Sequence, residues 1–167
     1  MHRKNTFTKD EILKCGRGEL EGVECPRLPL PNMLMFDSIT RISDEGGKYG
    51  RGEVAAEFEV SPDLWFFDCH FKDDPVMPGS LALDALCQLV GFYLGWKGHK
   101  GKGRAFGVGE VRYKGEILPT SGNISYRINI KKISHNPIPM AVADGEVFLD
   151  GQSVHTAKSL WVGIIPH

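Results

Sequence analysis

The sequence has almost no excess charge of either sign and no basic block, and these absences narrow the range of possible functions. Lysine and arginine together number 20 against 21 acidic residues, so the net charge is -1. Such a chain is not typical of a nucleic-acid-binding protein or of one that adheres to a lipid surface. The N-terminal segment MHRKNTFTKDEILK is too polar for a signal peptide. We therefore expect a soluble cytoplasmic protein with no nucleic-acid or membrane partner.

Cysteine is also scarce for a chain of 167 residues. Cys15, Cys25, Cys69 and Cys87 show no CxxC or metal-type spacing, and a disulfide framework is typical of shorter chains with denser cysteine. Cys87 falls in an apolar segment, where a small buried thiol is the ordinary interpretation. This usage predicts a protein of a reducing compartment.

The stretch of residues 64–96 contains what is unusual in this chain. An extended aromatic run, LWFFDCHF, brings His70 into apolar surroundings. Residues 80–96 then have helix length and hardly a polar side chain, and a helix that is apolar all round is buried on all sides. The exceptions, Asp84 and Gln88, are four residues apart and so share one face. Burying a carboxylate costs free energy, so we expect Asp84 to have a specific role. At about 25 Å, the helix is short for a membrane span.

The rest of the chain predicts a short helix, an irregular segment and six strands. Thr8 and Glu11 form a capping box, so a helix should begin there and stop near Gly16. Prolines make the segment up to residue 32 irregular. Strands are predicted at 33–42, 52–60, 105–113, 124–133, 140–149 and 153–164, with a flexible basic loop at 97–104. Asp150-Gly151 indicates a tight hairpin turn between the last two.

This order of elements predicts an α+β fold in one domain, residues 1–167, whose residues 1–32 form the N-terminal helix and an irregular wrap. With 41% hydrophobic residues the chain can build a substantial core. A mostly antiparallel sheet must curl around the apolar helix, because only a wrapping sheet buries a helix on most sides.

Taken singly, the candidate site residues have ordinary explanations. His70 is compatible with a satisfied core histidine, and Asp84 with a carboxylate that caps or pairs with a buried arginine. Gly79 follows Pro78 and is compatible with an ordinary helix start. Asp68, His70, Asp73 and Asp74 are a weak metal pattern, because no second histidine is near. No GxGxxG or GxSxG motif is present, which disfavours dinucleotide binding and serine hydrolysis.

Four segments together carry a family resemblance. LWFFDCHF, DPVMPGSLALDALCQLVGFYLGW, GKGRAFGVGEVRYKGEILPT and ADGEVFLDG resemble the bacterial 3-hydroxydecanoyl-acyl-carrier-protein dehydratase/isomerase family over roughly Thr8 to Val162. The resemblance implies a hot-dog fold, with about six antiparallel strands around one long helix, and a homodimer without cofactor or metal. It also implies that His70 and Asp84 from opposite subunits form each active site. The helix acid is Asp, which favours the bifunctional branch over the dehydratase that does not isomerise.

The residue types suit this chemistry. A neutral imidazole has a reference pKa of about 6.5 and is a suitable base for the C2 proton. A carboxyl on an apolar helix is expected to have its pKa raised by desolvation, so that it keeps a proton to donate. The helix start at Gly79 offers free N–H groups to the enolate oxygen. The resemblance implies that the Val76 carbonyl orients His70, and Gln88 and Cys69 are expected to adjust the site.

The implied macromolecular partner is acyl carrier protein, a small acidic protein. Its docking residues are expected among six cations: Lys97, Lys100, Lys102, Arg104, Lys131 and Lys132. A solvated basic loop explains the same residues equally well.

Three residues, Asp68, Ser80 and Cys87, depart from the family pattern. Asp68 adds negative charge near His70, and Ser80 and Cys87 are expected to affect the volume of the acyl tunnel. Two alternative functions remain: a dehydratase without isomerase activity, and a non-catalytic acyl-thioester binding module.

Overall fold

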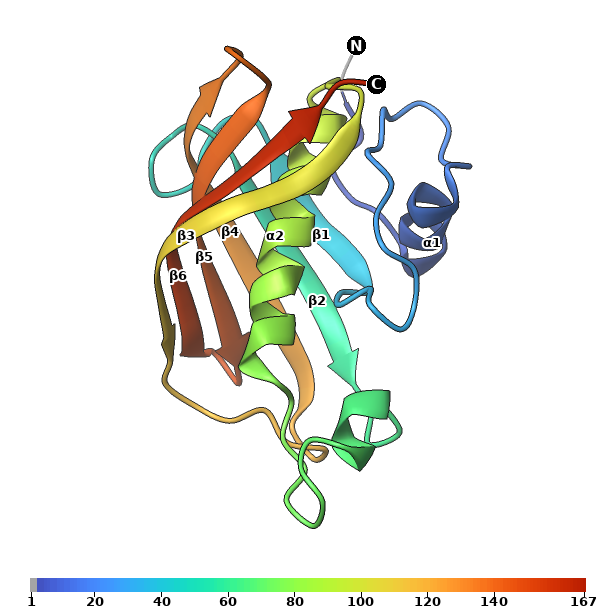
Figure 1. The fold of residues 1–167 in the computed structure, drawn as a ribbon, viewed down its shortest axis with the longest axis vertical. Coiled ribbons are helices and arrows are strands. Elements are labelled where there is room, and N and C mark those ends of the chain that lie inside the picture. The colour runs from blue at the N-terminus through green and yellow to red at the C-terminus, as the bar shows by residue number, and fades with distance from the viewer. Residues whose placement is uncertain (1–2) are drawn as a thin grey trace.

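Helix α2 (Gly79–Trp96) lies in the hollow of a curled six-stranded sheet, as Figure 1 shows for the computed structural model, which describes residues 3–167. All strand pairs are antiparallel, in the order β1-β2-β4-β5-β6-β3. The α+β fold predicted from the pattern is confirmed. The strands are β1 (Ser38–Ser43), β2 (Glu53–Val60), β3 (Lys102–Tyr113), β4 (Gly122–Ser134), β5 (Met140–Leu149) and β6 (Gln152–Ile165).

The core forms where α2 meets the inner face of the sheet. Leu86, Leu89 and Phe92 of α2 are almost completely buried, and inward-facing residues of β4 to β6 pack against the helix. The prediction that α2 is buried on all sides is wrong for the single chain. Ser80 is exposed, and Asp84, Cys87 and Gly91 are only half-buried. One face of α2 is therefore only partly covered by its own sheet.

The short helix α1 (Lys9–Arg17) begins as the sequence predicts. The Thr8 side chain accepts a hydrogen bond from the Glu11 N–H, and the Glu11 carboxylate accepts one from the Thr8 N–H, so the capping box is confirmed. The helix ends at Arg17, close to the predicted stop near Gly16, and Gly18 follows as its cap in the left-handed conformation (φ 75°) that closes a helix. In Figure 1 this helix lies beside the sheet and not in its hollow.

The first strand is shorter than predicted. It begins at Ser38, whereas residues 33–37 are not in a ladder. At two of them the bonds go to a side chain instead: the Met35 N–H donates to the Gln88 side chain, which in turn donates to the Met33 carbonyl. An apolar run alone does not reveal this, because the competing partner is a side chain more than 50 positions away along the chain.

Two further local predictions are corrected. The aromatic run before His70 is not extended: Trp65–Asp68 forms a 3-10 helix, η1, which buries Phe66 and Phe67. The basic loop is shorter than 97–104, because β3 begins at Lys102. Gly101 makes this early pairing possible, with φ 141° and a backbone so close to the Ile165 carbonyl that a Cβ would lie 2.3 Å from its oxygen. The Asp150-Gly151 hairpin is confirmed, with both residues at positive φ.

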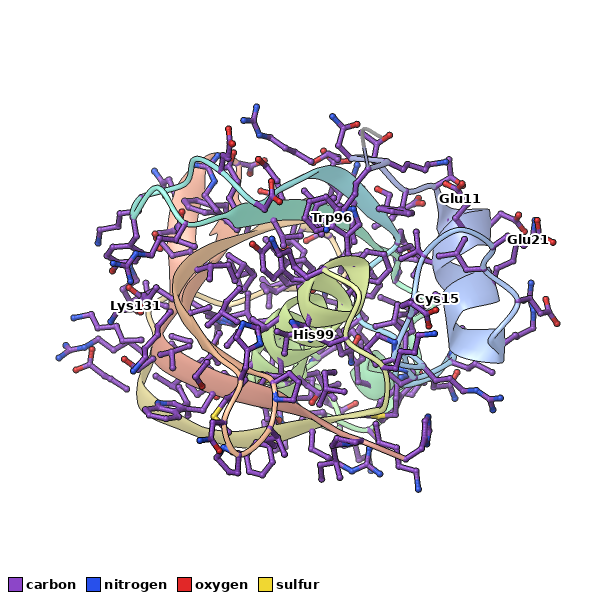
Figure 2. All side chains as sticks on the ribbon, turned by 90° about the horizontal axis from the view of Figure 1, so that it is seen from above. Glu11, Cys15, Glu21, Trp96, His99 and Lys131 are labelled. Atoms are coloured by element: carbon purple, nitrogen blue, oxygen red, sulfur yellow. A yellow bond between two sulfur atoms is a disulfide. The ribbon has the colours of Figure 1, made fainter. Side chains whose placement is uncertain are left out.

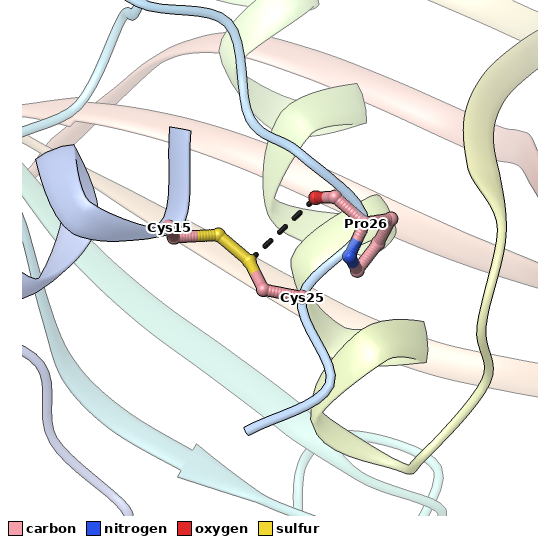
Figure 3. Close-up of a disulfide and its surroundings, with 3 residues drawn as sticks. All are labelled: Cys15, Cys25 and Pro26. Carbon is pink, nitrogen blue, oxygen red and sulfur yellow. Dashed lines mark hydrogen bonds between the residues drawn. A yellow bond between two sulfur atoms is a disulfide. The ribbon is translucent and has the colours of Figure 1, made fainter. Parts of the chain in front are cut away.

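A disulfide joins Cys15 of α1 to Cys25 (Figure 3), so the prediction that the cysteines are unpaired is wrong for these two. Cys15 is completely buried, and Cys69 and Cys87 are free. Sequence spacing did not reveal the pair because the fold of residues 16–24, not a motif, brings the two sulfurs together. Among residues 3–167, no helix combines the length and apolar character needed to cross a bilayer.

Breaking this disulfide should destabilise the protein. It closes a loop with a sequence separation of 10. Loop closure of that size restricts the unfolded chain, so reduction is expected to lower the free energy of unfolding by about 2–3 kcal/mol. Urea unfolding of the oxidised and dithiothreitol-treated protein measures the difference. Cys69→Ser serves as the control, because Cys69 lies outside the bond. Equal midpoints for the oxidised and reduced forms would contradict the prediction.

Candidate active site

His70 is held in one orientation by Val76. The loop between η1 and α2 turns back so that the Val76 N–H donates to the His70 carbonyl at 2.8 Å, and His70 Nδ1 lies 2.9 Å from the Val76 carbonyl oxygen. A carbonyl only accepts hydrogen bonds, so Nδ1 carries the proton. The lone pair of Nε2 is then free. The Phe71 ring lies against the imidazole, with the ring centroids 4.0 Å apart.

A cavity of about 350 Å³ opens beside His70. Val76, Gly79, Tyr113 and His155 share its lining with His70. The loop that carries His70 is fixed to the far side of this cavity, because the Met77 N–H donates to the Ile117 carbonyl between β3 and β4. The imidazole therefore faces a space bounded by the start of α2 and the end of β3.

Gly79 is the first residue of α2, and the Tyr113 ring packs closely against its backbone. A Cβ at this position would lie 2.7 Å from the Tyr113 ring, closer than side-chain carbons approach one another. The first N–H groups of a helix have no partner inside it and lie at the positive end of its dipole. The chain thus brings backbone donors into the same cavity as the imidazole.

Asp84 lies one and a half turns into α2 and is bound by Gln88. The Gln88 Nε2 group donates to the Asp84 carboxylate at 2.7 Å and to the Met33 carbonyl at 2.9 Å, while Oε1 accepts from the Met35 N–H at 3.1 Å. Gln88 is 8% exposed; its bond to Met35 is buried, whereas its bonds to Met33 and Asp84 are partly buried. They fix the carboxylate through one oxygen and leave the other available.

Asp84 lines a second cavity, of about 180 Å³, together with Cys87, Gln88 and Gly91. Its opposite wall is the segment of residues 26–29, which we call the strap, and the beginning of β3. Burial, and secondarily the nearby Asp84 charge, raises the pKa of the Cys87 thiol to about 11. Cys87 is therefore a protonated thiol at neutral pH and not a nucleophile.

The two catalytic candidates line different cavities of the single chain, His70 at the start of α2 and Asp84 on its partly covered face. Cys69 is exposed, and its Sγ lies 3.7 Å from the Trp65 and Phe66 carbonyls rather than against His70. In the part of the chain that is described, no group of three His, Cys, Asp or Glu side chains is arranged to hold a metal ion.

The six predicted docking cations fall into separate groups. Lys97 pairs with Asp44 at 3.1 Å, and Lys131 lies 3.6 Å from Asp144, so both contribute to the fold's own ion pairs. Lys132 is exposed in β4. The remaining three, Lys100, Lys102 and Arg104, line a cavity at the turn between α2 and β3.

Two site residues were missed in the sequence. Tyr113 and His155 both line the His70 cavity and pack edge to face, with ring centroids 5.1 Å apart. Burial lowers the pKa of His155, whose Nε2 donates to the Gly115 carbonyl. The alternation of β6 places residue 155 inward, but no local pattern places it near Gly79.

Comparison with known proteins gives one family and several structures. Residues 28–158 match a FabA-like domain. The dehydratase heterocomplex ApeI:P from Xenorhabdus doucetiae is similar with a TM-score of 0.64 and 20% identity, over 83% of this chain and 88% of that chain. A hypothetical thioesterase with coenzyme A from Streptococcus pneumoniae has a TM-score of 0.56 and 12% identity, over 77% and 85%. At these identities the structures establish the fold alone, which is the hot-dog fold.

Replacing Gln88 by leucine tests how much the buried amide stabilises this region. The substitution keeps the side-chain volume but leaves the Met35 N–H and the Met33 carbonyl without their partner. An unsatisfied buried group costs about 1–3 kcal/mol, so Gln88→Leu should lower the free energy of unfolding by about that amount. Urea denaturation measures the loss. Gln152→Leu, at an exposed position, is the matched control and should change stability little; equal effects of both variants would contradict the prediction.

Proposed function

The chain belongs to the FabA-like domain family, and we propose that it dehydrates 3-hydroxydecanoyl-acyl-carrier-protein and isomerises the product in unsaturated fatty acid biosynthesis. The observation that carries this proposal is the shared cavity of His70 and Gly79. There, the 2.9 Å contact to Val76 leaves Nε2 as a free base next to backbone donors. A free base and backbone donors in one cavity are the two features that a hot-dog dehydratase needs.

In the proposed first step, His70 Nε2 removes a proton from C2 of the substrate. The electrons of the broken C–H bond move toward the thioester carbonyl, whose oxygen gains negative charge. The Gly79 N–H donates to that oxygen, and the helix dipole favours the charge. The glycine at this position supports this role, because it has no side chain to cover its backbone N–H.

In the second step, the carboxyl of Asp84 protonates the C3 hydroxyl. The C3–O bond then breaks, water leaves, and the enolate electrons form the C2–C3 double bond of the trans-2-enoyl thioester. Gln88 supports this assignment, since its hydrogen bond fixes one carboxyl oxygen and directs the other toward the cavity. Isomerisation uses the same groups: removal of a C4 proton and reprotonation at C2 give the cis-3-enoyl thioester.

The proposal takes His70 and Asp84 of each active site from two subunits, and their lining of separate cavities in one chain supports this. We place the second subunit at strand β3. This strand is at the edge of the sheet, and Phe106 and Val108 on it are 52% and 36% exposed. An unpaired edge with apolar side chains favours pairing with another strand. The partly covered face of α2 then meets the partner subunit.

We place the reaction in the cytoplasm, with acyl carrier protein as the macromolecular partner and no cofactor. Lys100, Lys102 and Arg104 support carrier docking, because they are exposed cations around the cavity at the turn between α2 and β3, and Arg104 also lines the Asp84 cavity. Positive charge at this point speeds the encounter with an acidic carrier.

Removing either catalytic group should abolish dehydration. His70→Ala lacks the base and Asp84→Asn lacks the ionisable acid, and general acid–base groups contribute about 100- to 10,000-fold each. We expect kcat for the 3-hydroxydecanoyl thioester to fall by at least that factor in each variant, while circular dichroism and the oligomeric state stay unchanged. Turnover by Asp84→Asn comparable to that of the wild type would remove Asp84 from the mechanism.

Product analysis of the wild type by mass and double-bond geometry separates the alternatives. Trans-2 and cis-3 products together support the proposal, whereas the trans-2 product alone indicates a dehydratase without isomerase activity. Free acid and thiol indicate a thioesterase. Binding without turnover indicates an acyl-thioester binding module.

A charge on the edge strand should separate the subunits and, with them, the two halves of the site. Val108→Asp places a carboxylate in the proposed strand pairing, where a buried unpaired charge is strongly unfavourable. Sedimentation velocity should show a monomer, and dehydration should be lost. Leu118→Asp, at an exposed apolar position outside β3, is the control and should leave the dimer intact. A dimeric, active Val108→Asp variant would place the interface elsewhere.

A further inference from the structure

The strap over the Asp84 cavity is anchored at its first residue by a disulfide. Pro26, which begins the strap, directly follows Cys25, and Cys25 is bonded to Cys15 of α1. Figure 2 shows Cys15 on the side of α1 that faces the rest of the molecule, and this residue is completely buried. The two Cα atoms are 5.9 Å apart, a usual spacing for a disulfide, so the sulfurs pair without movement of the backbone.

Few other contacts hold the strap in place. Residues 26–29 form no backbone–backbone hydrogen bond within the described part of the chain. Pro26 packs so closely on Gly95 of α2 that a Cβ there would lie 1.9 Å from the proline ring, and Leu28 is buried. Segments with few hydrogen bonds of their own open most easily, so loss of the covalent anchor is expected to raise the fraction of molecules whose strap is open.

The anchored strap keeps the Asp84 cavity small. This cavity has a volume of about 180 Å³, and all four residues of the strap, 26–29, line it. Pockets that hold organic ligands have volumes of roughly 300–1,000 Å³. An acyl chain that is to reach Asp84 therefore needs the strap to move away from α2. The bond at Cys25 opposes that movement, because it ties the beginning of the strap to α1.

The disulfide can exchange with thiols from solution. Cys15 is completely buried, whereas Cys25 is half-buried and lines a cavity of about 510 Å³ at the turn between α2 and β3. A thiolate can therefore approach the Cys25 sulfur through this cavity. Arg27, Lys100 and Lys102 line the same cavity, and positive charge favours the thiolate form in which cysteines exchange.

We propose that the Cys15–Cys25 pair is a reversible redox switch, in which the disulfide holds the strap closed over the Asp84 cavity and reduction releases it. The inference rests on the proposed function where it concerns activity, since it takes Asp84 as part of the active site. Disulfides of cytosolic proteins are usually transient and redox-sensing, which fits the proposed cytoplasmic location. The reduced protein is the active form, although it is the less stable one.

The reductant in this proposal is a dithiol. One of its thiolates attacks the Cys25 sulfur, the bond between Cys25 and Cys15 breaks, and Cys15 leaves as a thiolate that takes up a proton. The second thiol of the reductant then displaces Cys25 from the mixed disulfide. Two electrons and two protons pass to the cysteine pair, and the dithiol becomes a disulfide. Glutathione disulfide reverses the reaction and is released as two molecules of glutathione.

Activity should depend on the redox state of this pair. Protein oxidised with glutathione disulfide is compared with protein reduced by dithiothreitol and then freed of it, with the 3-hydroxydecanoyl thioester as substrate. The bond closes a loop with a sequence separation of 10. Such a closure disfavours an open strap by up to roughly 100-fold, so reduction should raise kcat/KM at least about tenfold.

Two double variants identify the cysteines responsible. Cys15→Ser with Cys25→Ser cannot form the bond and should match the reduced wild type after either treatment. Cys69→Ser with Cys87→Ala retains the pair and should keep the wild-type ratio of reduced to oxidised activity. A redox response that persists in the first variant, or disappears in the second, would assign it to other cysteines.

Trypsin tests the strap itself and does not depend on turnover. Cleavage after Arg27 needs the strap to leave α2, so it should be at least about tenfold faster in the reduced protein. Cleavage after Lys48, between β1 and β2, should keep its rate, because this position is not tied to the disulfide. Mass spectrometry of the fragments measures both rates.

Three results would overturn the proposal. They are a bond that dithiothreitol does not reduce in the folded protein, equal cleavage after Arg27 in the two forms, and an oxidised protein as active as the reduced one. A protein that turns over no thioester contradicts the proposed function instead. Faster cleavage after Arg27 on reduction supports release of the strap in that case too.

Discussion

The buried amide of Gln88 is the contact on which both the fold and the Asp84 half of the site depend. It saturates a backbone donor and a backbone acceptor that no strand pairs, and it binds the Asp84 carboxylate with the same amide nitrogen. A buried polar group is costly unless its hydrogen bonds are made, so this amide is compatible with few arrangements of its neighbours. The segment before β1, the helix and the carboxylate are therefore fixed together.

The second constraint is the apolar character of α2. A single sheet covers most of this helix but leaves one face and one strand edge, β3, available. Asp84 and Gly91 lie on that face, and Phe106 and Val108 lie on that edge. Asp84, the proposed catalytic carboxyl, thus lies on a face of α2 that its own sheet leaves partly uncovered and that a second chain would cover in the proposed dimer.

The strap lines the Asp84 cavity and is itself held in place by contacts with the rest of the fold. Its residues 26–29 make no backbone–backbone hydrogen bonds within the described residues, and the strap is held by the adjoining Cys15–Cys25 bond, by buried Leu28 and by Pro26 on α2. Segments with few internal contacts open first. Disulfides are rare in reducing cytosol, so a cytoplasmic form of this protein relies more on the apolar contacts of the strap.

Much of the architecture was determined by the sequence itself. Some signals depend only on neighbouring residues and could therefore be predicted from the sequence. They are the capping box at Thr8, the Asp150-Gly151 turn and the apolar stretch of α2. His70, Gly79 and Asp84 were singled out in the sequence because their residue types are costly or unusual where they stand, and their catalytic roles stay predictions. Only the tertiary structure decided that Gln88 replaces a strand ladder at residues 33–37, that Cys15 meets Cys25, and that Arg27 joins Lys102 and Arg104. Those contacts join residues that are distant in sequence or lie in segments without a period, and the closed fold, not local preference, sets their distances.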